Sequence, residues 1–171
     1  DSTIGFPYNM ALGALRNDKL LFDMGKSVAE QYKRLGLHID FAPVVDVNTN
    51  PKNPVIGNRS YGENKYNVTQ KAMHFMQGLQ SEHIIGSAKH FPGHGDTAQD
   101  SHKTLPTVDL SESRIESVEL YPYNELIKTG LTGVLVAHLS VPSLEPDASL
   151  PTSLSENIVT KMLKEKMQFK G

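Results

Sequence analysis

Apolar side chains recur at helical spacing in four stretches of the chain. The clearest of them covers residues 18–35 and ends before Gly36, a residue type that commonly caps helix C-termini. Its apolar stripe consists of Leu21, Met24, Val28, Tyr32 and Leu35. The other stretches are residues 65–82 behind Asn64 as N-cap, a region that starts near Ser111 or Ser113 and is divided by Pro122, and residues 155–167. The periodicity therefore predicts four helical regions.

Short apolar runs between these stretches indicate strands at residues 37–46, 84–89 and 133–138. The first run is interpreted as a buried strand, and the loop after it, residues 47–62, is rich in Asn, Pro and Gly. Loops of that length in compact domains are usually functional or disordered. Strands that alternate with helices predict an α/β fold with a parallel sheet.

The number of strand–helix units decides between two α/β architectures. A complete (β/α)8 TIM barrel needs about 250 residues, so 171 residues are expected to form an incomplete portion of one, without an internal domain boundary. A doubly wound sheet is the alternative, but the Gly-rich phosphate turn expected after its first strand is missing. The chain lacks an initial Met and stops directly after a helical pattern, so we expect a fragment.

Composition narrows the classes of ligand. The formal net charge is −2, from 17 basic and 19 acidic residues, which gives no electrostatic reason to expect nucleic acid or an anionic membrane as partner. No run approaches the roughly 20 apolar residues of a membrane span. The absence of Cys excludes disulfides, thiolate metal sites and a Cys nucleophile, but leaves the compartment open. A small or neutral ligand is expected.

The richest chemistry lies in the loop after the second predicted strand, residues 89–102. Its end places Asp100 two residues before His102, so the carboxylate can hold one imidazole nitrogen while the other faces a substrate. This arrangement suits a general acid/base, although a short Asp-x-His spacing alone also occurs in solvated loops. Gly93 and Gly95 supply turn conformations that can bring the backbone over a pocket.

Further candidates lie at strand ends and in the long loop. Lys89 and His90 should point to opposite sides of their strand, so that one faces the barrel axis. Arg59 could grip ligand oxygens with its planar guanidinium or be an ordinary surface residue. Asp46 is interpreted as a carboxylate that organises the loop, with a place in the site wall as the alternative. His138, after the third predicted strand, is either at the catalytic face or a core histidine.

The histidines and carboxylates of residues 90–102 also allow a zinc or iron site, which we consider less favoured because their spacing shows no preorganised ligand pair. A Ser nucleophile is less favoured still, because no Ser lies in a Gly-x-Ser-x-Gly turn.

Taken together, these segments resemble glycoside hydrolase family 3, specifically its β-N-acetylglucosaminidase (β-hexosaminidase) branch. The resemblance covers nearly the whole chain, and the loop motif at residues 89–102 is its most specific part. The matching segments are APVVDV at 42–47, PVIGNRSYG at 54–62, KHFPGHGDTAQDSH at 89–102, SLS at 153–155 and FKG at 169–171.

The resemblance implies a (β/α)8 barrel and hydrolysis of terminal β-linked N-acetylglucosamine with retention, without cofactor or metal. It implies His102 as proton donor and acceptor with Asp100 as its partner, and sugar binding by Arg59, Lys89 and His90. The nucleophilic Asp of relatives lies a few residues beyond the segment that resembles residues 169–171, so we expect these residues alone to be inactive.

Two alternatives to this hydrolase remain. One is a β-N-acetylglucosaminide phosphorylase, because a His acid/base tolerates phosphate as acceptor better than a carboxylate does. The other is a non-catalytic carbohydrate-binding fragment. The resemblance implies an N-acetylglucosamine-containing oligosaccharide or muropeptide as ligand, a role such as peptidoglycan recycling, and a bacterial cytoplasm or envelope. It leaves the natural substrate undefined.

Overall fold

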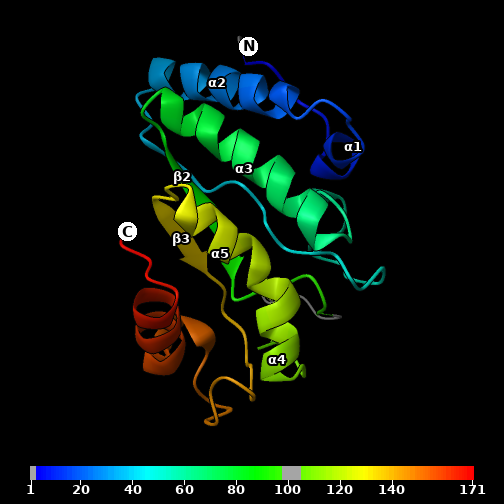
Figure 1. Cartoon of the computed structure of the whole chain (residues 1–171), viewed down its shortest axis with the longest axis vertical. Coiled ribbons are helices and arrows are strands. Elements are labelled where there is room, and N and C mark those ends of the chain that lie inside the picture. Colours follow the sequence, from blue (N-terminus) through cyan, green and yellow to red (C-terminus); the bar gives the residue numbers. More distant parts are fainter. Residues whose placement is uncertain (1–2, 98–104) are drawn as a thin grey trace.

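A three-stranded parallel sheet runs through the centre of the molecule. The computed structural model describes residues 3–97 and 105–171 (Figure 1). Strands β1 (Ile39–Asp40), β2 (Ile85–Phe91) and β3 (Gly133–Val136) pair side by side in chain order. Ile39 lies opposite Ile85, and Ser87 lies opposite Gly133. Three parallel strands in chain order agree with part of a (β/α)8 barrel.

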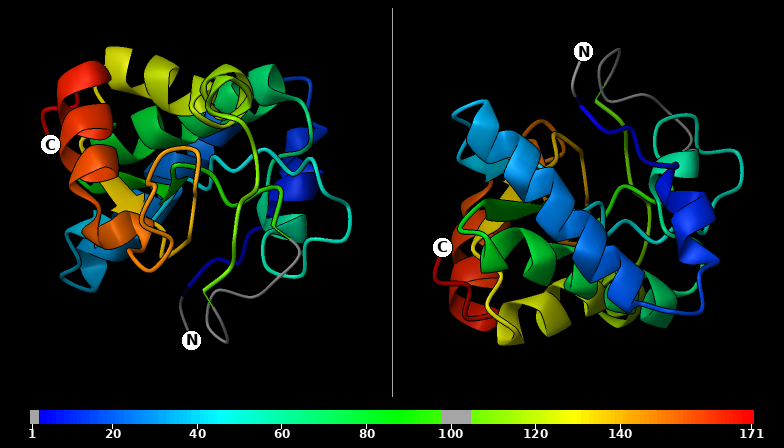
Figure 2. Two further views of the ribbon diagram at one scale, coloured as in Figure 1. Left: turned by 90° about the horizontal axis from the view of Figure 1, so that it is seen from below. Right: turned by 90° about the horizontal axis from the view of Figure 1, so that it is seen from above.

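Helices cover the outer face of this sheet. Figures 1 and 2 show α2 and α3 side by side, with α5 beside α3 and the C-terminal helix η4 next to β3. The longer helices are α2 (Lys19–Arg34), α3 (Lys65–Ser81), α5 (Tyr121–Lys128) and η4 (Asn157–Lys166). The short ones are α1 (Asn9–Gly13), η1 (Gly57–Arg59), α4 (Glu112–Arg114), η2 (Ile115–Glu119) and η3 (Thr152–Leu154). Both η2 and η4 have π-type hydrogen bonding.

The helix signals in the sequence correspond to observed caps. Asn64 caps α3 by accepting hydrogen bonds from the backbone N–H groups of Tyr66 and Asn67. The third region begins at Ser111, whose side chain accepts from the Arg114 backbone, so Ser111 rather than Ser113 is the N-cap. The break near Pro122 is also present, because α5 starts after η2 with Pro122 in its first turn.

Two glycines allow α2 and α3 to approach closely. A Cβ on Gly25 would lie 2.3 Å from the carbonyl oxygen of Phe75, and one on Gly78 would lie 2.2 Å from that of Phe22. Any larger side chain at either position would push the helices apart. The layer that supports the sheet therefore depends on direct backbone contact.

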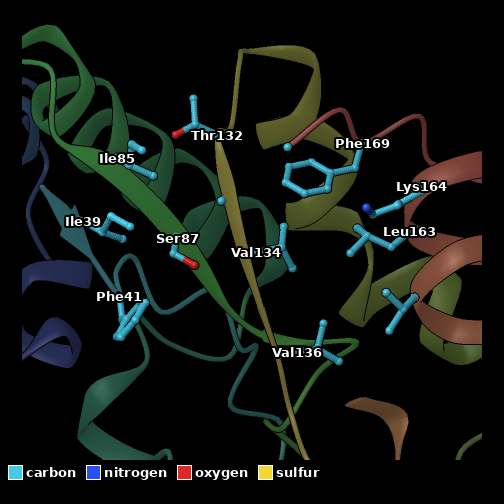
Figure 3. A pocket seen from close by; sticks show the side chains of 13 residues that line it. Ile39, Phe41, Ile85, Ser87, Thr132, Val134, Val136, Leu163, Lys164 and Phe169 are labelled. Carbon is cyan, nitrogen blue, oxygen red and sulfur yellow. The ribbon is translucent and has the colours of Figure 1, made fainter. Parts of the chain in front are cut away.

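The buried strand expected at residues 37–46 is wrong in length and only partly right in burial, because residues 43–46 are buried whereas residues 37–39 and 41 are exposed. Only Ile39–Asp40 forms a strand, with an isolated bridge from Val44 to Lys89. Ile39 and Phe41 are exposed, and Figure 3 shows them near Ile85 along an open cavity of about 400 Å³, with Val134 and Val136 across the ribbon toward Leu163 and Phe169. Ile39, Phe41 and Ile85 lie on the open side of the sheet, whereas Val134 and Val136 pack against the buried core. Further strands would have to lie on the open side to bury the first three residues. In the described residues that side is open.

Among the described residues, no helix has both the length and the apolar character that a membrane crossing requires.

Candidate functional site

A second cavity, of about 530 Å³, opens at the C-terminal ends of β2 and β3. In an α/β barrel this end of the strands carries the catalytic loops. The polar side chains that line it are Arg59, His90, His94 and His138. Arg59 arrives from η1 in the loop at residues 47–62, while His90 belongs to β2. The structure thus brings these two predicted residues together, although 31 positions separate them.

The carboxylate of Asp46 contacts His90, a lining residue, but does not itself line the cavity. Its Oδ2 lies 2.7 Å from His90 Nδ1, and its Oδ1 accepts the backbone N–H groups of His90 at 3.3 Å and His94 at 2.7 Å. The side chain has no solvent exposure. Burial acts to raise the pKa of Asp46, but the hydrogen bonds and charge of His90 and the backbone donors outweigh it, and the pKa is lowered. The interpretation of Asp46 as an organiser of the loop is confirmed.

Arg59 contacts the other nitrogen of the same imidazole. Its Nη2 lies 3.3 Å from His90 Nε2, and its Nη1 donates to the carbonyl oxygen of Val55 at 3.2 Å. The interpretation of Arg59 as an ordinary surface residue is therefore wrong, because the guanidinium is anchored at a cavity. Asp46, His90 and Arg59 form one continuous chain of hydrogen bonds.

Lys89 is half-buried next to these groups. Burial and the positive charge of Arg59 lower the pKa of Lys89, while Asp40 and Asp46 partly offset this effect. Lys89 and His90 are therefore both within electrostatic reach of Arg59. The expectation for Lys89 and His90 assumed that side chains alternate regularly between the two sides of the strand. The pairing of β2 with β3 is irregular from Lys89 to Phe91, so that rule does not describe this end of β2.

A buried polar cluster fixes the start of the loop that follows β2. Thr97 Oγ1 lies 2.6 Å from His94 Nδ1, and Asn53 Nδ2 donates to the His94 carbonyl oxygen at 2.7 Å. Burial lowers the pKa of His94 and keeps the imidazole neutral. Sequence reasoning missed Asn53 and Thr97 as supports. The only signal for them in the sequence is the many polar residues of the loop at 47–62 and of the loop after β2. That composition does not show which residues hydrogen-bond to each other.

Gly93 and Gly95 are needed for different reasons. Gly93 has φ +143°, and a Cβ there would lie 2.6 Å from Glu119 Cγ. Glu119 is buried, and its two carboxylate oxygens accept from Arg114 Nη1 at 2.5 and 2.6 Å. Gly95 needs the absence of a side chain, because it lies against the backbone of Val47. The loop is thus packed against two different parts of the chain.

His138 follows β3 and lines the same cavity. It is exposed, and its Nδ1 lies 2.8 Å from Ser153 Oγ. The alternative of a core histidine is therefore wrong. The side chain is held by one hydroxyl and lines the cavity.

Asp100 and His102, the predicted catalytic pair, lie outside the described residues. Their assignment stays a prediction. Within residues 3–97 and 105–171, no cluster of three or more His, Asp or Glu side chains could hold a metal ion. Asp96 Oδ1 accepts a hydrogen bond from Thr49 Oγ1 at 3.1 Å, which joins the long loop to the loop after β2.

Comparison with known proteins gives a consistent result. Residues 1–171 match the family described as glycosyl hydrolase family 3 N terminal domain. Beta-hexosaminidase A of Pseudoalteromonas piscicida is 33% identical over 184 residues, a match that covers 100% of this chain and 31% of that protein.

Two solved structures are also similar. A glycoside hydrolase family 3 β-N-acetylglucosaminidase from Paenibacillus sp. str. FPU-7 has a TM-score of 0.92 and 39% identity, with 95% of this chain and 31% of that chain covered. NagZ from Neisseria gonorrhoeae, in complex with N-trifluoroacetyl-D-glucosamine, has a TM-score of 0.92 and 28% identity, with 100% and 51% covered. The chain spans about one third to one half of these relatives.

Proposed function

The chain belongs to glycosyl hydrolase family 3, and we propose that the full-length protein removes terminal β-linked N-acetylglucosamine with retention of configuration. Residues 1–171 are a portion of the family's (β/α)8 barrel. We propose that they form one continuous part of the catalytic domain. Similarity to proteins named as β-hexosaminidases supports this function.

The observation that carries the proposal is the cavity at the ends of β2 and β3. A neutral sugar offers hydroxyl and amide groups, and its recognition requires several donors and acceptors around a concave site. Arg59 and His90 line this cavity and contact each other, and Arg59 supplies N–H donors. Lys89 does not line the cavity, but it precedes His90 in β2 and lies within electrostatic range of Arg59. We therefore assign sugar binding to these three residues. The glucosamine derivative bound by the Neisseria relative supports a ligand of this class.

The chemistry is assigned to His102 and Asp100. In the first step the His102 imidazolium donates its proton to the glycosidic oxygen as the bond to the leaving group breaks. The carboxylate of an Asp located outside residues 1–171 then bonds to the anomeric carbon. In the second step neutral His102 takes a proton from water, which attacks that carbon and releases the Asp. Asp100 would orient the ring and stabilise its charged form.

The test uses the full-length protein with an aryl N-acetyl-β-glucosaminide, and the matched aryl β-glucoside as control substrate. We expect selective release of the aryl group from the aminosugar, and loss of at least about 100-fold in kcat with His102→Ala, the range of general acid/base catalysis. His74→Ala, on the outer helix α3, is the matched control and should leave the rate unchanged.

Other outcomes separate the alternatives. Cleavage that requires inorganic phosphate and yields a sugar 1-phosphate would replace hydrolysis by the phosphorylase reaction. Binding of N-acetylglucosamine without cleavage would favour the carbohydrate-binding alternative. Absence of both cleavage and binding would contradict the proposal as a whole. Muropeptides and chitooligosaccharides, compared by kcat/KM, would then define the natural substrate class.

A further inference from the structure

We propose that Asp46 is a positioning residue that fixes the tautomer of His90 and, through it, the orientation of Arg59 in the sugar-binding cavity. This inference rests on the proposed function for its kinetic consequence, but its structural part can be measured without any substrate. Asp46 does not line the cavity, so its effect has to pass through the imidazole of His90.

The donor and acceptor chemistry of the chain allows only one tautomer. A guanidinium has N–H donors and no acceptor, so the contact of Arg59 Nη2 requires that His90 Nε2 accept. In a neutral imidazole with an acceptor Nε2, the hydrogen is on Nδ1. That hydrogen points to Asp46 Oδ2 at 2.7 Å, where a carboxylate accepts it. Both contacts of the ring therefore specify the same Nδ1–H form.

Because Asp46 is fully buried, its carboxylate requires hydrogen-bond donors from the protein. A carboxylate with no solvent exposure is stable in its ionised form only when donors surround it, and Asp46 has three within the described residues. Its charge lies on one side of the neutral ring and that of Arg59 on the other. Arg59 donates to the Val55 carbonyl oxygen through Nη1 and contacts His90 Nε2 through Nη2.

The Asp46→Asn variant distinguishes two roles of Asp46: control of the His90 tautomer, and support of the loop backbone. Oδ1 alone accepts both backbone N–H groups, so an Asn oxygen in that position preserves the loop anchor. The Asn NH2 group then replaces Oδ2 and donates to His90 Nδ1. The ring hydrogen must move to Nε2, where it faces the N–H groups of Arg59. Two donors in contact repel each other, and the guanidinium is displaced.

The first measurement is the ring nitrogen spectrum of 15N-histidine-labelled full-length protein. The correlations between ring protons and ring nitrogens distinguish the two neutral tautomers from the charged form, and His90→Gln identifies the His90 signals by their loss. We expect Nδ1–H in the wild type and in Arg59→Gln, and Nε2–H in Asp46→Asn. A wild-type His90 that is charged or in the Nε2–H form would overturn the proposal, even if every variant failed to fold.

The second measurement is steady-state kinetics with the aryl N-acetyl-β-glucosaminide. We expect Asp46→Asn to raise KM about 10- to 100-fold, the range for a lost hydrogen bond to a charged group, with a smaller change in kcat. Asp23→Asn, in an exposed ion pair with Lys19, is the matched control. Unchanged KM together with a reversed tautomer would overturn the functional part. A wild type inactive on all substrates but with the expected tautomers would contradict the proposed function alone.

Discussion

Gly95 lies against the backbone of Val47 so closely that a Cβ on Gly95 would be 1.9 Å from the Val47 carbonyl oxygen. This contact joins the loop after β2 to the chain segment that leaves the first strand, directly beside Asp46. Nearby, Asn50 and Thr49 donate hydrogen bonds to the same loop. The two loops that carry Arg59 and the residues after His90 are thus positioned by direct contact.

Gly95→Ala should therefore destabilise the protein. The added methyl group has no space, and overpacking of this kind costs about 1–3 kcal/mol. The free energy of unfolding, measured by urea denaturation, should fall by that amount, and the KM for the aryl aminosugar should rise. Gly5→Ala is the control, since a Cβ at Gly5 meets nothing within 4 Å. Equal stability of both variants would contradict the close contact.

The buried neutral His94 should make stability fall in mild acid. Burial holds its pKa below the ordinary value of 6.5, so below pH 6.5 the unfolded chain binds a proton that the folded chain does not. Stability is therefore retained at higher pH and lost as the pH falls from 6.5 toward the folded pKa, by at most about 1.4 kcal/mol per pH unit. Asp46 does not contribute here, because its lowered pKa places its loss of stability below pH 3.8.

His94→Asn removes this titration while its amide can still contact Thr97. The variant should be less stable at pH 7 but show a shallower decline between pH 7 and 5 in urea denaturation. His74→Asn, at an exposed helix position, controls for removal of one histidine. Identical pH slopes for His94→Asn and the wild type would show that His94 is not protected from protonation.

His138 should contribute to ligand binding and little to stability. It is exposed at the cavity and held by the Ser153 hydroxyl, so its removal costs a hydrogen bond to ligand rather than core packing. We expect His138→Ala to lower kcat/KM for the aryl aminosugar by up to about tenfold, with a change in unfolding free energy within about 0.5 kcal/mol. Ser153→Ala should give a smaller loss, since the ring remains. Full activity of His138→Ala would exclude this role.

Local rules predicted the helices well because their signals are short-range. The stripe at residues 18–35 and the Asn64 cap describe α2 and α3 to within one residue at each end. The strand predicted at residues 37–46 is too long, and its burial is correct only at residues 43–46, since apolar side chains alone do not say whether a second layer covers them. Ile39 and Phe41 show the difference, because each lies on the open side of the sheet.

For the site, sequence reasoning proposed Arg59, Lys89 and His90, and only coordinates could supply the hydrogen-bond partners of Arg59 and His90. The residues that orient them come from positions 44 and 31 residues away. Asp46 was correctly interpreted as a loop organiser, but the sequence does not show its hydrogen bond to His90 Nδ1. Asn53 and Thr97 were missed for the same reason. The assignments of Asp100 and His102 stay predictions.

By itself the sequence determined the alternation of strands and helices, the family resemblance and the residue types available for chemistry, because periodicity, caps and motifs are properties of neighbouring residues. Tertiary structure alone decided which of these side chains meet. The Asp46–His90–Arg59 chain requires β2, the segment after β1 and the η1 turn to converge at one edge of the sheet. Hydrogen bonds act only within about 3 Å, so such partners are set by the packing of distant segments.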